Sequence, residues 1–295
     1  MKFPGSKAAA MTLVEVMVTV AVISVAGLGV FEMLRTGMIL FGKNTAINLS
    51  HAESRFSLLE LQQELSASAS TPELTSSSGA VLSGTAPGPA AGVYFQGYAG
   101  GPFSLAVTSG SIPVGATSIQ VITGTNFKPL PGMTIHIQSL PLTTNSSTSL
   151  VELLLSGSTP YTSSGSGSAT TYTPTISGSV GSVICLHDQV NSGIALTVAC
   201  FFTTPIIYVV QNGQLVRQSL DPAGSGKMLS TVLAYNVSSA APFSMPTVNN
   251  SPGNTFVQVQ NFTAFDPSSS NRGYHAVITP LTVQVSHYAQ LTTLY

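Results

Sequence analysis

The sequence predicts an α+β fold in which a long hydrophobic N-terminal helix packs on a mainly antiparallel β-domain that carries a β-rich insertion. The first observation is an almost unbroken apolar stretch from Met11 to Leu34, which continues as an amphipathic pattern to residue 66. The second is that short apolar runs with strand propensity follow, separated by Gly, Pro, Ser and Asn. Strands of this spacing favour antiparallel pairing.

The composition excludes some classes of protein. The chain has 295 residues, of which 43% are hydrophobic, so it can bury a sizeable core. Only 6% are charged and the net charge is −1, and the nine Lys and Arg residues are scattered along the chain. Nucleic-acid binding requires a concentrated basic surface. We therefore expect no nucleic-acid partner.

The N-terminal apolar stretch is long enough to cross a membrane, because about twenty apolar residues span a bilayer as a helix. Lys2 and Lys7 precede it, with no acidic residue among residues 1–10. Basic residues at one end of a span favour the cytoplasmic side. The pattern predicts a single pass with its N-terminus in the cytoplasm and its C-terminal domain on the other side.

Glu15 lies four positions into this apolar stretch. An ionised carboxylate at the centre of a membrane helix costs roughly 2.5 to 3.5 kcal/mol, so this charge needs a partner. An alternative is that Glu15 lies shallow enough for its side chain to reach the lipid headgroups.

The segment Met11-Thr12-Leu13-Val14-Glu15-Val16-Met17 resembles the processing motif of type IV prepilins and pseudopilins. The resemblance implies that residues 1–10 are a leader, which prepilin peptidase removes between Ala10 and Met11 before methylating the new N-terminus. It also implies that Glu15 pairs with the N-terminal amine of a neighbouring subunit, which neutralises two buried charges. The family usually has Gly and Phe around the cut, where this chain has Ala10 and Met11.

A general secretory signal is the alternative interpretation of the N-terminus, with a small-residue cleavage site at Ser24-Val25-Ala26. Two features disfavour it. Glu15 would interrupt its apolar region, and the helical apolar pattern continues past the supposed cut to Leu34.

Residues 35–70 continue the helix as an amphipathic segment. Apolar residues recur at steps of three and four between Ile47 and Leu65, with polar residues such as Glu60 and Glu64 between them. Pro72 marks the end. One helix from Thr12 to Ser66 would be about 80 Å long. We expect residues 11–34 to form the transmembrane and filament-core part.

Residues 71–295 are expected to form the globular β-rich domain, with residues 71–92 as a linker and a Ser/Thr/Gly tract at 156–181 as an exposed loop. The Asn212-Gly213 pair predicts a hairpin within Ile206–Gln218. Its residues Tyr208, Gly213, Leu215 and Arg217 resemble a hairpin of J-type minor pseudopilins and related minor pilins. Residues of about 94–185 are then an insertion.

The predicted strands are 93–95, 104–108, 118–123, 134–138, 150–155, 183–186, 195–203, 228–235, 255–259, 275–279 and 281–288.

The two cysteines, Cys185 and Cys200, flank a turn-like Asn191-Ser192-Gly193. A hairpin there would bring them together, and in an oxidising compartment a disulfide is then expected. The alternative is a pair of small buried core residues.

Candidate catalytic groups are sparse, and we expect no enzyme, metal or cofactor. The five histidines show no zinc-ligand spacing, and the acids beyond the helix lie far apart in sequence. Cys185-Leu186-His187-Asp188 juxtaposes a thiol, an imidazole and a carboxylate, but a disulfide would consume the thiol.

The resemblance implies a structural role as a minor pseudopilin or pilin of a type II secretion pseudopilus or a type IV pilus. The implied partners are other pilin or pseudopilin subunits, prepilin peptidase, the inner-membrane assembly platform and the inner membrane itself. The implied location is the bacterial inner membrane with the domain in the periplasm, then a periplasmic or cell-surface filament. The alternative is a pilin-like adhesin whose Ser/Thr-rich β-domain binds glycans or surfaces. Secretion, pilus and DNA-uptake systems all remain open.

Overall fold

The computed structural model describes residues 12–82, 88–106, 111–139, 149–157, 161–182, 184–185, 199–235, 237–245, 255–260, 262 and 281–285. Within these residues, one α-helix, α1, covers Leu13–Ser66. The strands are β1 Glu73–Thr75, β2 Gly92–Leu105, β3 Ser111–Ile112, β4 Val121–Ile122, β5 Thr134–Ser139, β6 Ser149–Ser156, β7 Ser163–Ser164, β8 Thr171–Tyr172, β9 Thr175–Ile176, β10 Ile184–Cys185, β11 Ala199–Gln211, β12 Gln214–Leu220, β13 Met228–Ala234, β14 Phe243–Ser244, β15 Thr255–Val259 and β16 Leu281–Val285. A short 3-10 helix covers Gly167–Ala169.

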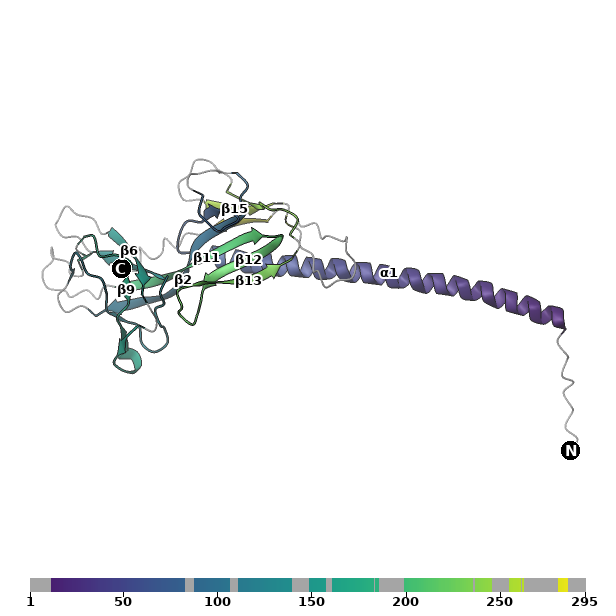
Figure 1. The fold of residues 1–295 in the computed structure, drawn as a ribbon, viewed down its shortest axis with the longest axis horizontal. Helices are drawn as coiled ribbons and strands as arrows, with labels where there is room; N and C mark the ends of the chain where they lie inside the picture. The colour runs from purple at the N-terminus through teal and green to yellow at the C-terminus, as the bar shows by residue number, and fades with distance from the viewer. Residues whose placement is uncertain are drawn as a thin grey trace, which may run out of the picture.

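The predicted α+β organisation is confirmed at this level: one long apolar N-terminal helix is followed by largely antiparallel strands (Figure 1). The main sheet has eleven strands, and every strand pair in the described residues is antiparallel. Its strand order is β7-β8-β4-β2-β11-β5-β6-β9, with β1 beside β2 and with β12 and β13 continuing from β11. Two smaller sheets, β3–β10 and β14–β15–β16, complete the described fold.

Two hydrophobic cores divide the β-domain into what we call the proximal lobe and the distal lobe. The proximal core joins the end of α1 to the sheet and includes Leu61, Phe95 and Tyr208, all fully buried. The distal core includes Ile135, Ile137 and Phe202, also fully buried. The distal lobe lies at the far end of the molecule from the free part of α1 (Figure 1).

The two long strands β2 and β11 pass through both lobes and pair with each other along most of their length. We predicted each as shorter runs, 93–95 and 104–108 for β2, and 195–203 followed by the hairpin from Ile206 for β11. The structure instead continues β11 through Pro205 and accommodates the glycine-rich stretch of β2 with register shifts opposite Cys200 to Thr203. The sequence expectation of short strands here was wrong.

Pro205 is tolerated because, on one side of β11, it lies between the end of the pairing with β5 and the start of the pairing with β12. On the side of β11 away from β2, the strand pairs with β5 at Cys200–Thr203 and with β12 from Ile206 onward. Thr204 and Pro205 have neither partner, so the missing proline N–H breaks no ladder bond. This gap is the boundary between the two lobes.

Several other strand predictions agree with the structure. The runs 134–138, 150–155, 228–235 and 255–259 correspond to β5, β6, β13 and β15. The linker 71–92 instead contains β1, and the Ser/Thr/Gly tract contains β7, β8 and β9. The predicted strand 275–279 lies outside the described residues.

The cysteine hairpin expected around residue 192 is not formed by the described residues. The backbone of Cys185 in β10 pairs with Ser111 in β3, while Cys200 in β11 pairs with Phe103 and Ile137. Cys200 is a buried free thiol, and burial raises its pKa to about 12. Cys200 is therefore not in a disulfide in this structure, while the side chain of Cys185, its predicted partner, lies outside the described residues.

Candidate assembly helix and its junction with the β-domain

Helix α1 begins with a capping box, which the sequence pattern Thr12-x-x-Glu15 signals. The Glu15 backbone N–H donates to the Thr12 hydroxyl oxygen at 3.3 Å, and the Thr12 backbone N–H donates to Glu15 Oε2 at 2.9 Å. The carboxylate also lies at the positive end of the helix dipole. Glu15 therefore has a local structural role, which our sequence reasoning did not include.

The other carboxylate oxygen of Glu15, Oε1, makes no hydrogen bond with the residues that the structure describes. The side chain is exposed. Glu15 thus retains capacity to accept from a donor outside the subunit. The predicted processing residues, Ala10 and Met11, lie outside the described residues.

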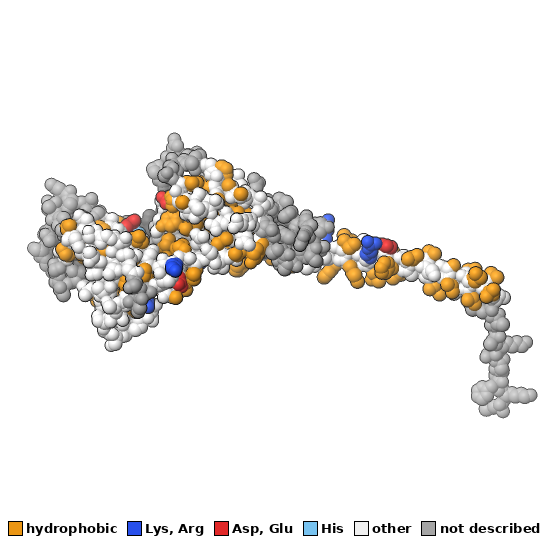
Figure 2. Space-filling model, in the orientation of Figure 1, with side chains coloured by type: hydrophobic (Ala, Val, Ile, Leu, Met, Phe, Trp, Pro, Cys, Tyr) orange, Lys and Arg blue, Asp and Glu red, His pale blue; other side chains and the backbone are white. Residues whose placement is uncertain are grey.

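The first half of α1 stands free of the β-domain. Residues Leu13–Thr45 form a 33-residue segment, whose most apolar 18-residue stretch has a mean hydropathy of 2.3 and is not buried. Figure 2 shows hydrophobic side chains along this whole projecting segment. Its length and composition fit a membrane anchor, and they fit a signal sequence equally.

An ion pair interrupts the apolar surface of the free segment. Arg35 Nη1 lies 3.6 Å from Glu32 Oε1, one helical turn away, and both side chains are exposed. Such a surface pair contributes little to stability. It does place opposite charges together about 26 Å along the helix from Glu15.

The second half of α1 packs on the sheet through a stripe of leucines. Leu58, Leu61 and Leu65 are buried in the proximal core, as their spacing of three and four predicts. The exposed Leu59 is on the opposite side.

We expect Leu61→Ala to lower the free energy of unfolding by about 2 to 5 kcal/mol, because Leu61 is fully buried and the substitution leaves a cavity. Leu59→Ala is the matched control, since Leu59 is 55% exposed and its loss should cost no more than about 0.5 kcal/mol. Thermal unfolding of the full chain in detergent, followed by circular dichroism, measures both. Equal melting temperatures for the two variants would contradict the packing of α1.

A polar clamp holds the same helix at a fixed register on the sheet. Arg217 makes a bidentate interaction with Glu64, with Nη2 to Oε1 at 2.6 Å and Nε to Oε2 at 3.0 Å. The Tyr208 hydroxyl donates to Glu64 Oε2 at 2.6 Å. Glu60 Oε1 lies 3.6 Å from Arg217 Nε. These four residues are the junction clamp.

Strand register explains the clamp. Tyr208 and Arg217 lie directly opposite each other in β11 and β12, so both side chains point to the helix side of the sheet. The hydrogen bond to Glu64 raises the pKa of Arg217, and burial raises the pKa of Tyr208. Arg217 therefore stays charged and Tyr208 stays neutral. Tyr208 and Arg217, two of the hairpin residues named in the sequence resemblance, thus position the helix.

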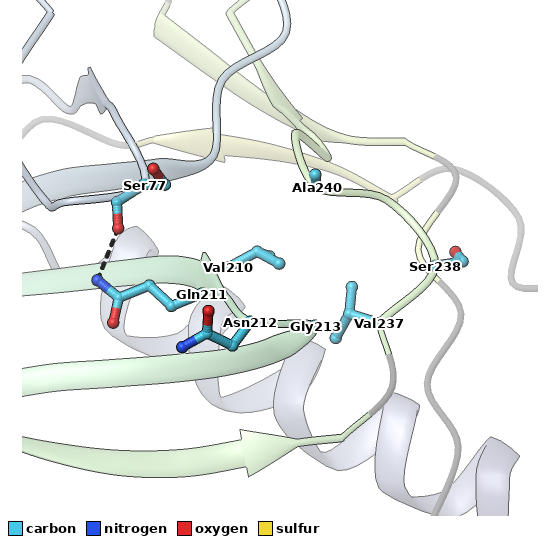
Figure 3. Close-up of a pocket in the computed structure, with 8 residues that line it drawn as sticks. All are labelled: Ser77, Val210, Gln211, Asn212, Gly213, Val237, Ser238 and Ala240. Carbon is cyan, nitrogen blue, oxygen red and sulfur yellow. Dashed lines mark hydrogen bonds between the residues drawn. The ribbon is translucent and has the colours of Figure 1, made fainter.

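The turn of this hairpin adopts the predicted Asn-Gly geometry, with φ of 51° at Asn212 and 71° at Gly213. An open hollow of about 460 Å³ lies beside it, lined by Val210, the turn and Val237 (Figure 3). Gln211 Nε2 donates to the Ser77 carbonyl oxygen at 2.7 Å at its edge. The lining has no titratable side chain, so we assign no chemistry to this hollow.

Among the residues that the structure describes, the remaining sequence candidates form no cluster. His187 and Asp188 lie outside the described residues, as do His275 and His287. His136 is buried in the distal lobe, far in the fold from Glu15. Within the described ranges, no three His, Cys, Asp or Glu side chains lie close enough to hold a metal ion.

Comparisons of the chain with protein-family models, curated proteins and solved structures gave no significant match.

Proposed function

We propose that this chain is a pilin-like structural subunit, a minor pseudopilin or minor pilin, that is anchored by α1 and then built into an extracytoplasmic filament. The observation that carries the proposal is the 54-residue helix, whose apolar first half is exposed and whose second half is locked onto the β-domain. An exposed apolar helix of this length needs lipid or other helices around it.

The charges on the free segment support a membrane position before assembly. Glu15 and the Glu32–Arg35 pair are separated by about 26 Å along the helix, close to the roughly 30 Å thickness of a bilayer core. Each charge can then lie near one membrane face. Lys2 and Lys7 precede the helix in sequence and favour the cytoplasmic side, so the β-domain, which follows the helix, is on the periplasmic side in this proposal.

In the proposed assembly step, the subunit leaves lipid and its apolar helix packs against helices of other pilin or pseudopilin subunits. Prepilin peptidase first cuts between Ala10 and Met11. Glu15 Oε2 remains in the capping box, while Oε1 accepts from the terminal ammonium of a neighbouring subunit. The inner-membrane assembly platform supplies the site of this exchange.

A second candidate function is an adhesin, and the two-lobed architecture favours it. The distal lobe has its own core and lies farthest from the free part of α1 (Figure 1). In a subunit anchored through α1, this lobe is presented away from the membrane, where it can bind glycans or surfaces.

N-terminal sequencing of the protein recovered from its native membrane tests the proposal. We expect a chain that begins at Met11 with a methylated amine. A chain that begins at Gly27 would identify the apolar stretch as a cleaved secretory signal and would overturn the proposal.

A further inference from the structure

Strand β6 is an edge strand of the distal lobe over most of its length. It pairs with β5 from Ser149 to Leu154, while β9 joins its other side only at Leu155 and Ser156. The Leu154 carbonyl accepts from the Ser177 N–H at 2.7 Å on this outer side. Because backbone groups alternate along an antiparallel strand, those of Leu150 and Glu152 point to the same side. Among the described residues nothing pairs with them there.

The side chains of these alternate residues form an exposed row on one face of the sheet. Leu150 is 51% exposed and Leu154 is 50% exposed, and Glu152 lies between them. Natural edge strands are usually protected by proline, charged side chains or short length. The segment Ser149–Leu154 has no proline, and its single charge is Glu152, so it is suited to accept an added strand that carries the opposite charge.

The neighbouring His136 does not neutralise Glu152, although its Nδ1 lies 3.4 Å from Glu152 Oε1. The Thr203 hydroxyl donates to Gln96 Oε1 at 3.1 Å, so its oxygen accepts from His136 Nε2–H at 2.9 Å. A neutral imidazole carries no charge that could compensate the Glu152 carboxylate. Burial lowers the pKa of His136, against the opposing effect of Glu152, and favours this neutral form.

We propose that the outer edge of β6 binds an extended segment of another protein as an added antiparallel strand. The segment carries Lys or Arg opposite Glu152, and apolar residues two positions before and after it lie beside Leu150 and Leu154. The backbone hydrogen bonds supply affinity, and the charged and apolar side chains supply selectivity.

A second copy of this chain is a poor occupant of the same edge. Two β6 strands in full antiparallel register would place Glu152 opposite Glu152 of the second copy, which is a destabilising like-charge pair. In addition, none of the nine Lys and Arg residues in the chain has apolar side chains at both flanking second positions. The partner is therefore a different protein.

The test uses the full-length protein in detergent and a labelled peptide, Ser-Thr-Val-Thr-Lys-Thr-Val-Thr-Ser, with binding followed by fluorescence anisotropy. We expect binding together with slower amide hydrogen exchange in residues 149–156. N-methylation of alternate peptide residues on the pairing side should abolish it. Exchanging the peptide Lys for Glu should weaken binding about fivefold.

A charge swap separates pairing from misfolding. Glu152→Lys should reverse the preference, so that the Glu peptide binds more tightly than the Lys peptide. Glu73→Lys, the same change on β1 of the proximal lobe, should leave the preference unaltered. An absence of binding, insensitivity to N-methylation, or an unchanged preference in Glu152→Lys would overturn the proposal. The test requires no filament, so its outcome is independent of the proposed assembly role.

Discussion

Filaments containing this subunit are expected to disappear when Glu15 is replaced by Gln. Glutamine retains the capping-box hydrogen bond from the Thr12 backbone, so α1 should still begin at the same residue. The substitution removes only the negative charge that the proposed neighbouring ammonium requires. Leaving that ammonium buried without a counter-charge costs about 3 to 5 kcal/mol, which corresponds to a loss of at least a hundredfold in association.

The measurement compares the protein in sheared filaments with the protein in membranes by immunoblotting. Glu32→Gln is the matched control, because it removes the same charge from the same exposed helix and should leave assembly intact. Normal filaments with Glu15→Gln would refute a charge-dependent assembly step. Loss of the protein from membranes would instead indicate a defect in insertion.

Arg217→Ala is expected to lower the free energy of unfolding by about 2 to 3 kcal/mol, since it leaves the partly buried Glu64 carboxylate without its bidentate partner. The second half of α1 should also exchange amide hydrogens faster. Arg217→Lys should be intermediate, because lysine keeps the charge but lacks the planar fork. Thermal unfolding and hydrogen exchange of the full chain in detergent measure both effects.

A double-mutant cycle with Glu64→Gln locates the effect in the clamp. If Arg217 and Glu64 act together, the double variant should be clearly more stable than the sum of the single losses predicts. Lys227→Ala is the control for removing an exposed cation, and it should change stability by no more than about 0.5 kcal/mol. Additive losses for Arg217 and Glu64 would rule out the clamp as a coupled unit.

Helix α1 was predicted closely because its signals are local. The apolar stretch from Met11, the leucine spacing and Pro72 predicted a helix over residues 12–66, and the observed bounds are Leu13–Ser66. The short strands β5, β6, β13 and β15 were also predicted, because each is a compact apolar run between turn residues. Such signals need no knowledge of distant segments.

The long strands were not predicted, because their continuity depends on partners far away in sequence. Pro205 is compatible with β11 only where β5 ends and β12 begins. Gly97 likewise fits β2 because Ile206 of β11 packs where a larger side chain would lie. Propensity alone assigns both residues to breaks.

In the candidate site, too, residues with a local sequence signal were identified, whereas contacts between distant residues were not. Glu15 was identified because a charge in an apolar stretch is conspicuous, although its capping role was overlooked. Arg217 was singled out only as part of a hairpin resemblance, and its partner Glu64 lies 153 residues away. No spacing rule connects two residues at that separation, so the clamp required the fold.

The continuity of β2 and β11 has a mechanical consequence. Because both strands pass through both lobes, a force that pulls the distal lobe away from the helix is carried by two continuous backbones and does not shear one strand against the other. On the side of β11 that faces β5 and β12, Thr204 and Pro205 pair with no strand. Under tension, the molecule should therefore bend at these two residues, while each lobe keeps its own interior intact.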